Sequence, residues 1–214
     1  MSDLLIKLGN CLQDGDRNNA VELARQALKE GIDPEVILNK GLIGNGMDHV
    51  GHKFREGEMF VPEVLASARV MHLVMEILKP HLVEKGSKPI GKAVIGSVLG
   101  DHHDIGKNIV IMMLTGAGFE VKDLGVNVPP QVFIDEAESF GADLIGMSTL
   151  LTTTIGAMQK TCALIKESKL KDKVKVIVGG APLNEKISLD AGADAYAENA
   201  GEAVIKSKEL LNII

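Results

Sequence analysis

In the first part of the chain, apolar residues recur every three or four positions, which is the period of an amphipathic helix. Asp16 and Asp33 stand just before two of these segments as N-terminal caps, and Pro34 suits a first turn, where its missing N–H is tolerated. Helices are expected at residues 3–12, 17–30, 34–57 and 62–79. Short loops join them, so this part of the chain predicts a small four-helix bundle.

In the second part, short β-branched runs alternate with helical segments. Strands are expected at residues 93–98, 120–123, 144–148, 175–178 and 195–196, and helices at 106–116, 130–140, 153–168, 184–191 and 201–211. Five such β-α units predict a five-stranded parallel sheet with helices on both faces, joined by right-handed crossovers. A flavodoxin-like (Rossmann-like) strand order is expected, with its switch point between the first and third strands.

The two patterns meet at residues 85–89, a polar stretch that contains glycine and proline and predicts a linker. We therefore expect a helical bundle domain at residues 1–87 and an α/β domain at residues 88–214.

Composition excludes several classes of protein. The chain has 214 residues, 45% of them hydrophobic and 24% charged, which suits a globular core. The net charge of −6 and the scattered lysines and arginines argue against a nucleic-acid partner. No apolar run is long enough for a membrane span, and the N-terminus lacks a signal-peptide pattern. Cys11 and Cys162 are typical of free thiols in a reducing compartment, so a cytoplasmic protein without a membrane or nucleic-acid partner is expected.

The candidate chemistry lies in the stretch Asp101–Gly106, between the first expected strand and its helix. This is the carboxyl end of a strand, where open α/β sheets bind their ligands. His103 can bind a metal through one ring nitrogen while Asp101 accepts a hydrogen bond from the other. Gly106 begins the helix without a side chain, so a ligand could approach its backbone closely.

Two further strand ends carry matching motifs, Ser148-x-Leu150 and Gly179-Gly180. The series D-x-H-x-x-G, S-x-L and G-G, in this order at strand ends, resembles the cobalamin-binding domain of methionine synthase and the small corrinoid proteins of methylamine, methanol and glycine-betaine methyltransferase systems. The resemblance extends over about residues 1–210. In the helical part it includes Phe54 and, seven positions on, Val61, where the family pattern has a leucine.

The resemblance implies a cobalamin or related corrinoid bound base-off, with His103 as the axial cobalt ligand and Asp101 as its hydrogen-bond partner. It implies that Ser148 hydrogen-bonds the displaced lower base, that Leu150 lines its slot, and that Gly179 and Gly180 leave room for the nucleotide tail.

For the helical domain, the resemblance implies a cap in which Phe54 and Val61 shield the upper face of cobalt. Shielding is useful because a methyl–cobalt bond and a Co(I) nucleophile both require the exclusion of water and oxidants.

The function that follows from the resemblance is that of a methyl carrier, with no catalytic residues and no turnover expected alone. A substrate-specific methyltransferase would load a methyl group onto Co(I), giving methyl-Co(III). A second methyltransferase would pass it to tetrahydrofolate or coenzyme M, and a reductive activation protein would restore Co(I). The cofactor supplies the chemistry, and the protein supplies ligation, orientation and protection.

Other interpretations remain open at this point. A cobalamin-dependent sensor or regulatory module would use the same two domains, and a mutase subunit would use the second. A flavodoxin-like interaction module without a cofactor would explain the α/β pattern. Asp101 and His103 could form an ordinary loop hydrogen bond, and Phe54 and Val61 could be core residues of the bundle.

Overall fold

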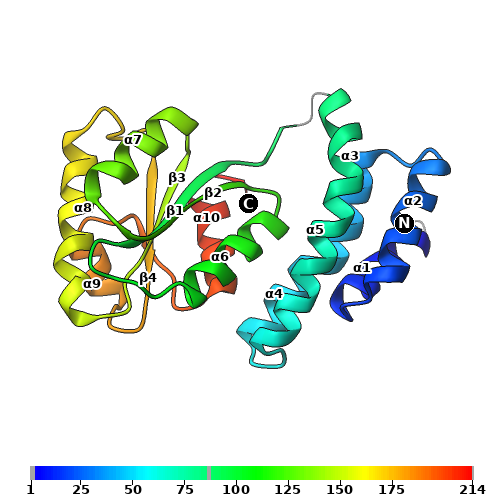
Figure 1. Cartoon of the computed structure of the whole chain (residues 1–214), viewed down its shortest axis with the longest axis horizontal. Helices are drawn as coiled ribbons and strands as arrows, with labels where there is room; N and C mark the ends of the chain where they lie inside the picture. The colour runs from blue at the N-terminus through cyan, green and yellow to red at the C-terminus, as the bar shows by residue number, and fades with distance from the viewer. Residues whose placement is uncertain (1–2, 86–87, 214) are drawn as a thin grey trace. The chain divides into compact units, whose positions relative to one another are not determined.

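The computed structural model describes residues 3–85 and 88–213. The chain forms two compact units: Met1–Pro89 with Gly116–Gly118, and Ile90–Thr115 with Phe119–Ile214 (Figure 1). Residues 86 and 87 of the predicted linker lie outside the described residues.

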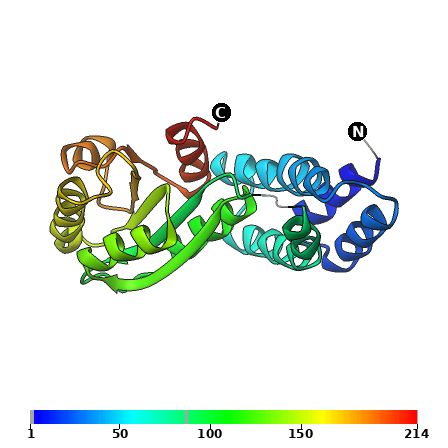
Figure 2. The same ribbon diagram turned by 90° about the horizontal axis from the view of Figure 1, so that it is seen from above.

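The first unit is helical. Its elements are α1 (Asp3–Gln13), α2 (Arg17–Lys29), α3 (Pro34–Val36), η1 (Ile37–Met47), α4 (Asp48–Arg55) and α5 (Val61–Glu84). The segments α3, η1 and α4 follow one another without a break, as one helical run (Figure 2). Both predicted caps are present: Asp16 accepts a hydrogen bond from the Asn19 N–H, and Asp33 accepts one from the Glu35 N–H.

The middle of this run, η1, is a π-helix, whereas the sequence pattern predicts an α-helix throughout. Helices α1 and η1 approach each other closely at glycines: a Cβ on Gly9 would lie 2.5 Å from the Asn45 Cβ, and a Cβ on Gly46 would lie 3.1 Å from Cδ2 of Leu12. Gln13 Nε2 donates a hydrogen bond to the Asn45 carbonyl at 2.7 Å. Contacts between neighbouring helices therefore accompany this unusual backbone.

The last helix of this unit corrects one expectation. The pattern predicts an end before Pro80, but α5 continues to Glu84 with Pro80 inside it. Proline removes one N–H from the helical ladder, and Pro80 lies on the exposed side, where water can reach the carbonyl left unpaired. Leu78 and Leu82 are both buried, so the core holds the helix together on either side of the proline.

The second unit is an α/β fold. Its elements are β1 (Lys92–Val98), α6 (Ile105–Gly116), β2 (Glu120–Val128), α7 (Pro130–Phe140), β3 (Leu144–Ser148), η2 (Thr152–Thr154), α8 (Ile155–Glu167), β4 (Lys175–Gly179), α9 (Glu185–Asp190), β5 (Ala195–Tyr196) and α10 (Ala200–Leu210). The strands form one parallel sheet in the order β2-β1-β3-β4-β5. The predicted fold class and flavodoxin-like order are confirmed.

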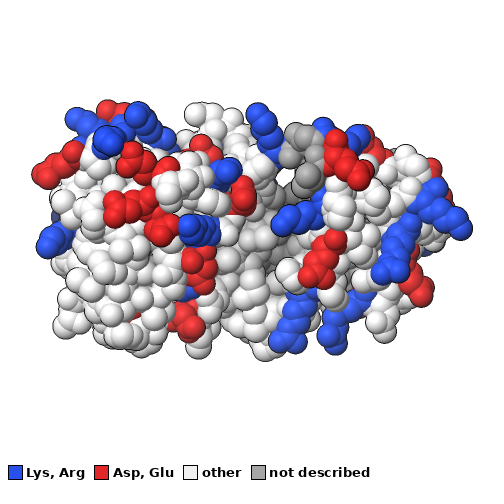
Figure 3. Space-filling view, turned by 45° about the horizontal axis from the view of Figure 1, so that its top comes forward, with Lys and Arg blue, Asp and Glu red and all other residues white. Residues whose placement is uncertain are grey.

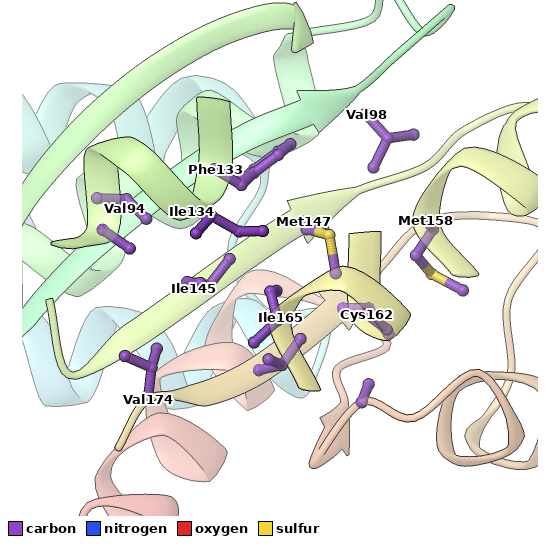
Figure 4. Close-up of a cluster of buried hydrophobic side chains, with 14 of the residues drawn as sticks. Val94, Val98, Phe133, Ile134, Ile145, Met147, Met158, Cys162, Ile165 and Val174 are labelled. Atoms are coloured by element: carbon purple, nitrogen blue, oxygen red, sulfur yellow. The ribbon is translucent and has the colours of Figure 1, made fainter. Parts of the chain in front are cut away.

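The sheet of this unit carries helices on both faces, with α7 and α8 on one side and α6 and α10 on the other (Figure 1). Side chains alternate along each strand. Val94 and Val98 of β1 and Ile145 and Met147 of β3 point into the buried cluster under α7 and α8, together with Phe133 (Figure 4). The alternate positions of the strands, including Ser97 and Ser148, therefore face α6 and α10.

Strand β2 is longer than the sequence predicts. The pattern favours residues 120–123, but pairing with β1 continues to Val128 through two irregularities in register. The extension contains Gly125 and Asn127, both with positive φ (+80° and +54°), which is why it resembles a turn in the sequence.

The surface carries charges of both signs. On the face shown in Figure 3, acidic and basic side chains are interspersed among uncharged ones. In the described part of the chain, no helix combines the length and the apolar character required to cross a membrane.

Candidate functional site

The loop between β1 and α6 lies where the chain's strand order reverses. From β1, the connection through α6 leads to β2 on one side, whereas β3 pairs with β1 on the other. A crevice forms at such a switch point, outside the carboxyl ends of the strands. The loop residues Asp101 and His103 follow β1, and Leu150 follows β3, so the fold brings the first two predicted motifs to one place.

Asp101 is the centre of a hydrogen-bond network. Its side chain is only 1% exposed. Oδ2 accepts hydrogen bonds from the Leu150 N–H at 2.6 Å and from the Thr154 hydroxyl at 3.2 Å. Oδ1 accepts from the His103 N–H at 3.1 Å and from His103 Nδ1 at 2.8 Å. The carboxylate thus joins the β1–α6 loop to the β3–α8 loop.

These bonds decide the charge of the carboxyl group. Burial tends to raise the pKa of Asp101, because it disfavours the charged form. The hydrogen bonds from Leu150, His103 and Thr154 favour the charged form more strongly, so the pKa lies below its ordinary value. Asp101 is therefore an anion at neutral pH, and it acts only as an acceptor.

This anion fixes the state of the His103 ring. With a proton on Nδ1, the ring donates to Asp101 Oδ1, and the lone pair of Nε2 is left to bind a metal. The His103 side chain is 51% exposed, and Nε2 has no hydrogen-bond partner among the residues of the described ranges. The geometry presents one oriented imidazole nitrogen at the edge of the sheet.

The backbone of His103 is also anchored. Ser97 is the penultimate residue of β1, and its side chain is on the α6 side of the sheet. Its hydroxyl donates to the His103 carbonyl oxygen at 2.6 Å. Next to the loop, Lys107 in the first turn of α6 is buried and forms an ion pair of 2.6 Å with Asp123 of β2. Lys107 also donates to Asn108 Oδ1 at 2.8 Å, so the buried ammonium group is hydrogen-bonded as well as paired.

Ser148 and Gly179 lie in one row across the sheet. Ser97 pairs with Ser148 in the β1–β3 register, and Ser148 pairs with Gly179 in the β3–β4 register. Neighbouring strands are about 4.8 Å apart. The three residues therefore form a strip of small residues at the carboxyl edge, on the α6 side of the sheet, and Ser97 at one end of it anchors His103.

The glycines of the predicted site have different surroundings. A Cβ on Gly180 would overlap the Thr149 carbonyl oxygen, and one on Gly179 would lie 2.9 Å from the Ala197 carbonyl oxygen. Both positions therefore exclude side chains because of neighbouring backbone. A Cβ on Gly106 would meet nothing within 4 Å, so the start of α6 is open to an approaching group.

Leu150 contributes in two ways. Its backbone N–H binds Asp101, a contact that the sequence pattern did not predict, and its side chain is exposed. Other large apolar side chains are exposed on the loops and chain segments at this edge. They are Leu99, Ile105, Val126 and Leu151. Exposed apolar surface around an oriented imidazole is typical of a ligand site.

The two remaining predicted residues belong to the helical unit. Phe54 lies in α4 and Val61 begins α5, and both are half-buried. Between them, Phe60 is 68% exposed, and its N–H donates to Glu63 Oε2 at 2.8 Å, which caps the start of α5.

Two residues of the network, Thr154 and Ser97, were not predicted from the sequence. Thr154 stands in the run Thr152-Thr153-Thr154, where nothing distinguishes it from its neighbours, and it is buried because η2 turns it toward Asp101. Ser97 lies within the expected strand at residues 93–98, and the pattern gives it no further role. Its hydroxyl could have been noticed as a polar group at the end of an apolar strand.

The site therefore has the features of a macrocyclic-metal site. Among the described residues, no three His, Cys, Asp or Glu side chains gather to hold a metal ion by themselves. A single oriented imidazole suits a metal whose equatorial ligands come from a macrocycle, as in haem proteins. At the same edge the start of α6 is open at Gly106, and Ser148 and Gly179 are half-buried.

Comparison with known proteins identifies the family. A B12 binding domain model matches residues 91–205, and a second B12 binding domain model matches residues 4–79. The chain belongs to the B12 binding domain family, so the predicted resemblance to corrinoid proteins is confirmed.

Relatives with assigned names agree with this. The chain is 45% identical over 196 residues to dimethylamine corrinoid protein 1 of Methanosarcina acetivorans, covering 91% of this chain and 92% of that one. It is 39% identical over 211 residues to trimethylamine corrinoid protein 1 of the same organism, covering 98% and 97%.

Two solved structures share the fold. A cobalamin-binding protein from Desulfitobacterium hafniense superimposes with a TM-score of 0.80 and 30% identity, covering 96% of this chain and 98% of that chain. A chain in the methanol:cobalamin methyltransferase complex of Methanosarcina barkeri gives a TM-score of 0.87 and 28% identity, covering 99% of this chain and 81% of that chain.

Proposed function

We propose that this protein is a corrinoid methyl carrier that binds its cofactor base-off, with His103 as the axial cobalt ligand. The observation that carries the proposal is the hydrogen bond of 2.8 Å between His103 Nδ1 and the buried Asp101 carboxylate, which leaves Nε2 available at the switch point of the sheet. The named relatives, which are methylamine corrinoid proteins, support the carrier role.

A bound corrinoid supplies a cobalt centre that can accept a methyl group and give it up again. The chain's own residues do the rest. Asp101 keeps the His103 ring in one tautomer and one orientation. Leu150 and Thr154 keep Asp101 charged by donating to Oδ2. The exposed apolar side chains at this edge would be covered by the corrin and would exclude water from it.

The strip of small residues is proposed to hold the tail of the cofactor. Ser148 would donate a hydrogen bond to the displaced lower base, and Leu150 would line its slot. Gly106 would let the nucleotide approach the start of α6. Gly179 and Gly180, whose Cβ positions are taken by the Ala197 and Thr149 carbonyls, would contact the tail through their own backbone. The support is the row Ser97–Ser148–Gly179 and the open space above Gly106.

For the helical unit we propose the role of a cap, in the division of the chain into residues 1–87 and 88–214. Phe54 and Val61 would shield the upper face of the corrin. The support is the match of this unit to its own B12 binding domain model and the half-buried state of both side chains, which leaves part of each available.

The proposed partners are methyltransferases. A substrate-specific methyltransferase would load the methyl group, as suggested by the likeness to a chain of a methanol:cobalamin methyltransferase complex. A second methyltransferase would deliver it to tetrahydrofolate or coenzyme M, and a reductive activation protein would keep the carrier competent. Because separate methyltransferases would load and deliver the methyl group, the carrier alone is expected to catalyse no methyl transfer.

The ligation is tested by electron paramagnetic resonance of the Co(II) form, using protein labelled with ¹⁵N-histidine. Wild-type protein reconstituted with hydroxocobalamin and reduced should show nitrogen splitting that changes from a triplet to a doublet with the label. His103→Gln should abolish the label-dependent splitting, and His102→Gln, at the exposed neighbouring position, should retain it. Label-dependent splitting that survives in His103→Gln would disprove this assignment.

The carrier role is tested with a panel of purified methylamine and methanol methyltransferases. Reduced holo-protein mixed with an isotopically labelled methyl donor should retain label only when a cognate methyltransferase is added. Labelling by the chain alone would contradict the carrier role. If the protein binds the corrinoid but none of the methyltransferases in the panel transfers label to it, it would instead behave as a sensor.

A further inference from the structure

Asn127, near the end of β2, forms two hydrogen bonds with the loop segment that precedes the candidate metal ligand, His103. Its side-chain Oδ1 accepts a hydrogen bond from the Gly100 N–H at 2.8 Å. Its own backbone N–H donates to the Asp101 carbonyl oxygen, also at 2.8 Å. One residue of β2 therefore binds the loop on both sides of the Gly100–Asp101 peptide.

The irregular register of β2 makes this possible. Gly125 pairs with Gly96 of β1, and Val128 pairs with Val98, so Val126 and Asn127 together stand opposite Ser97 alone. An extra residue of this kind is a β-bulge, which takes one N–H out of the ladder and redirects a side chain. The Asn127 N–H is thereby free of β1 and binds the Asp101 carbonyl instead.

The backbone conformation of Asn127 suits this role. Its φ is +54°, in the left-handed region that asparagine tolerates better than most residues. The residue is exposed, so it contributes little to the core. Its conformation and its two hydrogen bonds are directed at the loop, and burial does not account for them.

Other hydrogen bonds fix the same loop from β1, and the two bonds of Asn127 add to them from β2. The Asp101 N–H donates to the Val98 carbonyl at 2.9 Å, and Ser97 binds the His103 carbonyl. With Asn127, the backbone on both sides of Asp101 is fixed from two strands, β1 and β2. The Asp101 carboxylate then transmits this position to the imidazole ring through Nδ1.

We propose that Asn127 is a positioning residue for cobalt ligation, one that sets the orientation of His103 by holding the Gly100–Asp101 peptide. This rests on the proposed function, because His103 must first be the ligand. A metal–ligand bond is sensitive to small errors in position, and residues that orient a ligand affect metal binding without touching the metal.

The test uses two substitutions that separate the backbone from the side chain. Asn127→Gly keeps the N–H and accepts a positive φ without strain, but it removes the acceptor for Gly100. Asn127→Asp keeps an acceptor of the same shape. Each apo-protein is titrated with hydroxocobalamin, and the Co(II) form is examined with and without ¹⁵N-histidine. Asn212→Gly is the matched control, because Asn212 has the same φ of +54° and lies near the C-terminus.

The expected result is a heterogeneous spectrum for Asn127→Gly, in which part of the cobalt loses the histidine splitting. Its affinity for hydroxocobalamin should fall roughly three- to tenfold, the range that one lost hydrogen bond supports. Asn127→Asp should restore the wild-type spectrum, and Asn212→Gly should match wild type in both measurements.

The outcomes distinguish the two levels of the proposal. If wild type shows histidine-ligated cobalt and Asn127→Gly shows the same spectrum and affinity, the positioning role is wrong and the ligation stands. If Asn127→Gly and Asn127→Asp lose the signal equally, the side-chain acceptor is not the cause, and the proposal is overturned. If wild type itself shows no histidine ligation, the proposed ligation and the role of Asn127 fail together.

Discussion

The two units of this protein hold their candidate functional side chains by different means. In the α/β unit, His103 is fixed by directional hydrogen bonds with Asp101 and Ser97, and Asp101 is itself held by the Leu150 N–H from the loop after β3. In the helical unit, the segment from Phe54 to Val61 is held by local backbone bonds, such as that from the Gly57 N–H to the Phe54 carbonyl.

The difference matches the chemistry proposed for each unit. A metal ligand must be held at a fixed angle and in one tautomer, and only hydrogen bonds impose direction. A shield needs bulk and an apolar surface, and helix packing provides these without fixing every atom. We therefore expect polar substitutions to matter most in the α/β unit, and volume changes to matter most in the helical unit.

The largest effect should come from Asp101→Ala. The substitution removes the acceptor of four hydrogen bonds and leaves the part-buried N–H groups of Leu150 and His103 without their partner, whereas the Thr154 hydroxyl retains the Leu151 carbonyl as an acceptor. The free energy of unfolding of the apo-protein should fall by about 3 kcal/mol in a urea titration, as expected for unsatisfied buried groups. His102→Ala, at the exposed neighbouring position, should change it by less than about 0.5 kcal/mol. Equal effects of the two substitutions would show that the network adds little.

The same network has a pH signature. The pKa of Asp101 is lower in the folded protein than in the unfolded chain, so the unfolded chain binds the proton more readily. The stability that the carboxylate contributes is complete above the unfolded-state pKa, about 4. It is lost as the pH falls through the lower folded-state pKa. Wild type and Asp101→Asn should therefore differ constantly above about pH 5 and converge only in more acidic urea titrations.

A smaller effect is expected from Gly9→Ala in the helical unit. The new Cβ would lie 2.5 Å from the Asn45 Cβ and 2.8 Å from the Asn45 backbone, so α1 and η1 would have to separate. The free energy of unfolding should fall by about 2 kcal/mol, a typical result of overpacking. Gly156→Ala in α8 of the other unit meets nothing within 4 Å and should stabilise by about 0.5–1 kcal/mol, because alanine favours a helix. Thermal unfolding of both variants measures this contrast in sign, and a destabilised Gly156→Ala would contradict it.

The smallest effect on stability is expected from Phe54→Ala, since this side chain is only half-buried. The free energy of unfolding should fall by about 1 kcal/mol, from the loss of part of its apolar contact area. If the helical unit shields the corrin, bound methylcobalamin should nevertheless lose its methyl group several times faster under light, as followed by absorbance. Val61→Ala is the companion variant, and Phe140→Ala, a half-buried phenylalanine of the α/β unit, is the control. Loss of the methyl group at the wild-type rate in both Phe54→Ala and Val61→Ala would show that these residues do not shield the corrin and only pack in the helical unit.

The sequence by itself determined the order of the elements and the place of the site. Alternating strand and helix patterns specify β-α units, and the right-handed crossover rule then fixes the face of the sheet on which each connecting helix lies. The flavodoxin-like strand order was expected from the same pattern, and the sheet has it. Asp101 and His103 are close in sequence, so their pairing could be expected from two residues of one loop. Helix α5 and strand β2 were predicted too short, because Pro80 and Gly125 indicate ends only when tertiary contacts do not override them.

Only the tertiary structure decided which residues hold this pair in place. Thr154 reaches Asp101 from the loop after β3, and Asn127 reaches its backbone from a bulge in β2. The π-helical form of η1 likewise occurs where it packs against α1. Each of these depends on the register between segments that are distant in sequence. A one-dimensional pattern of apolar and polar positions carries no information on such a register, because it is set by strand pairing and helix packing after the chain has folded.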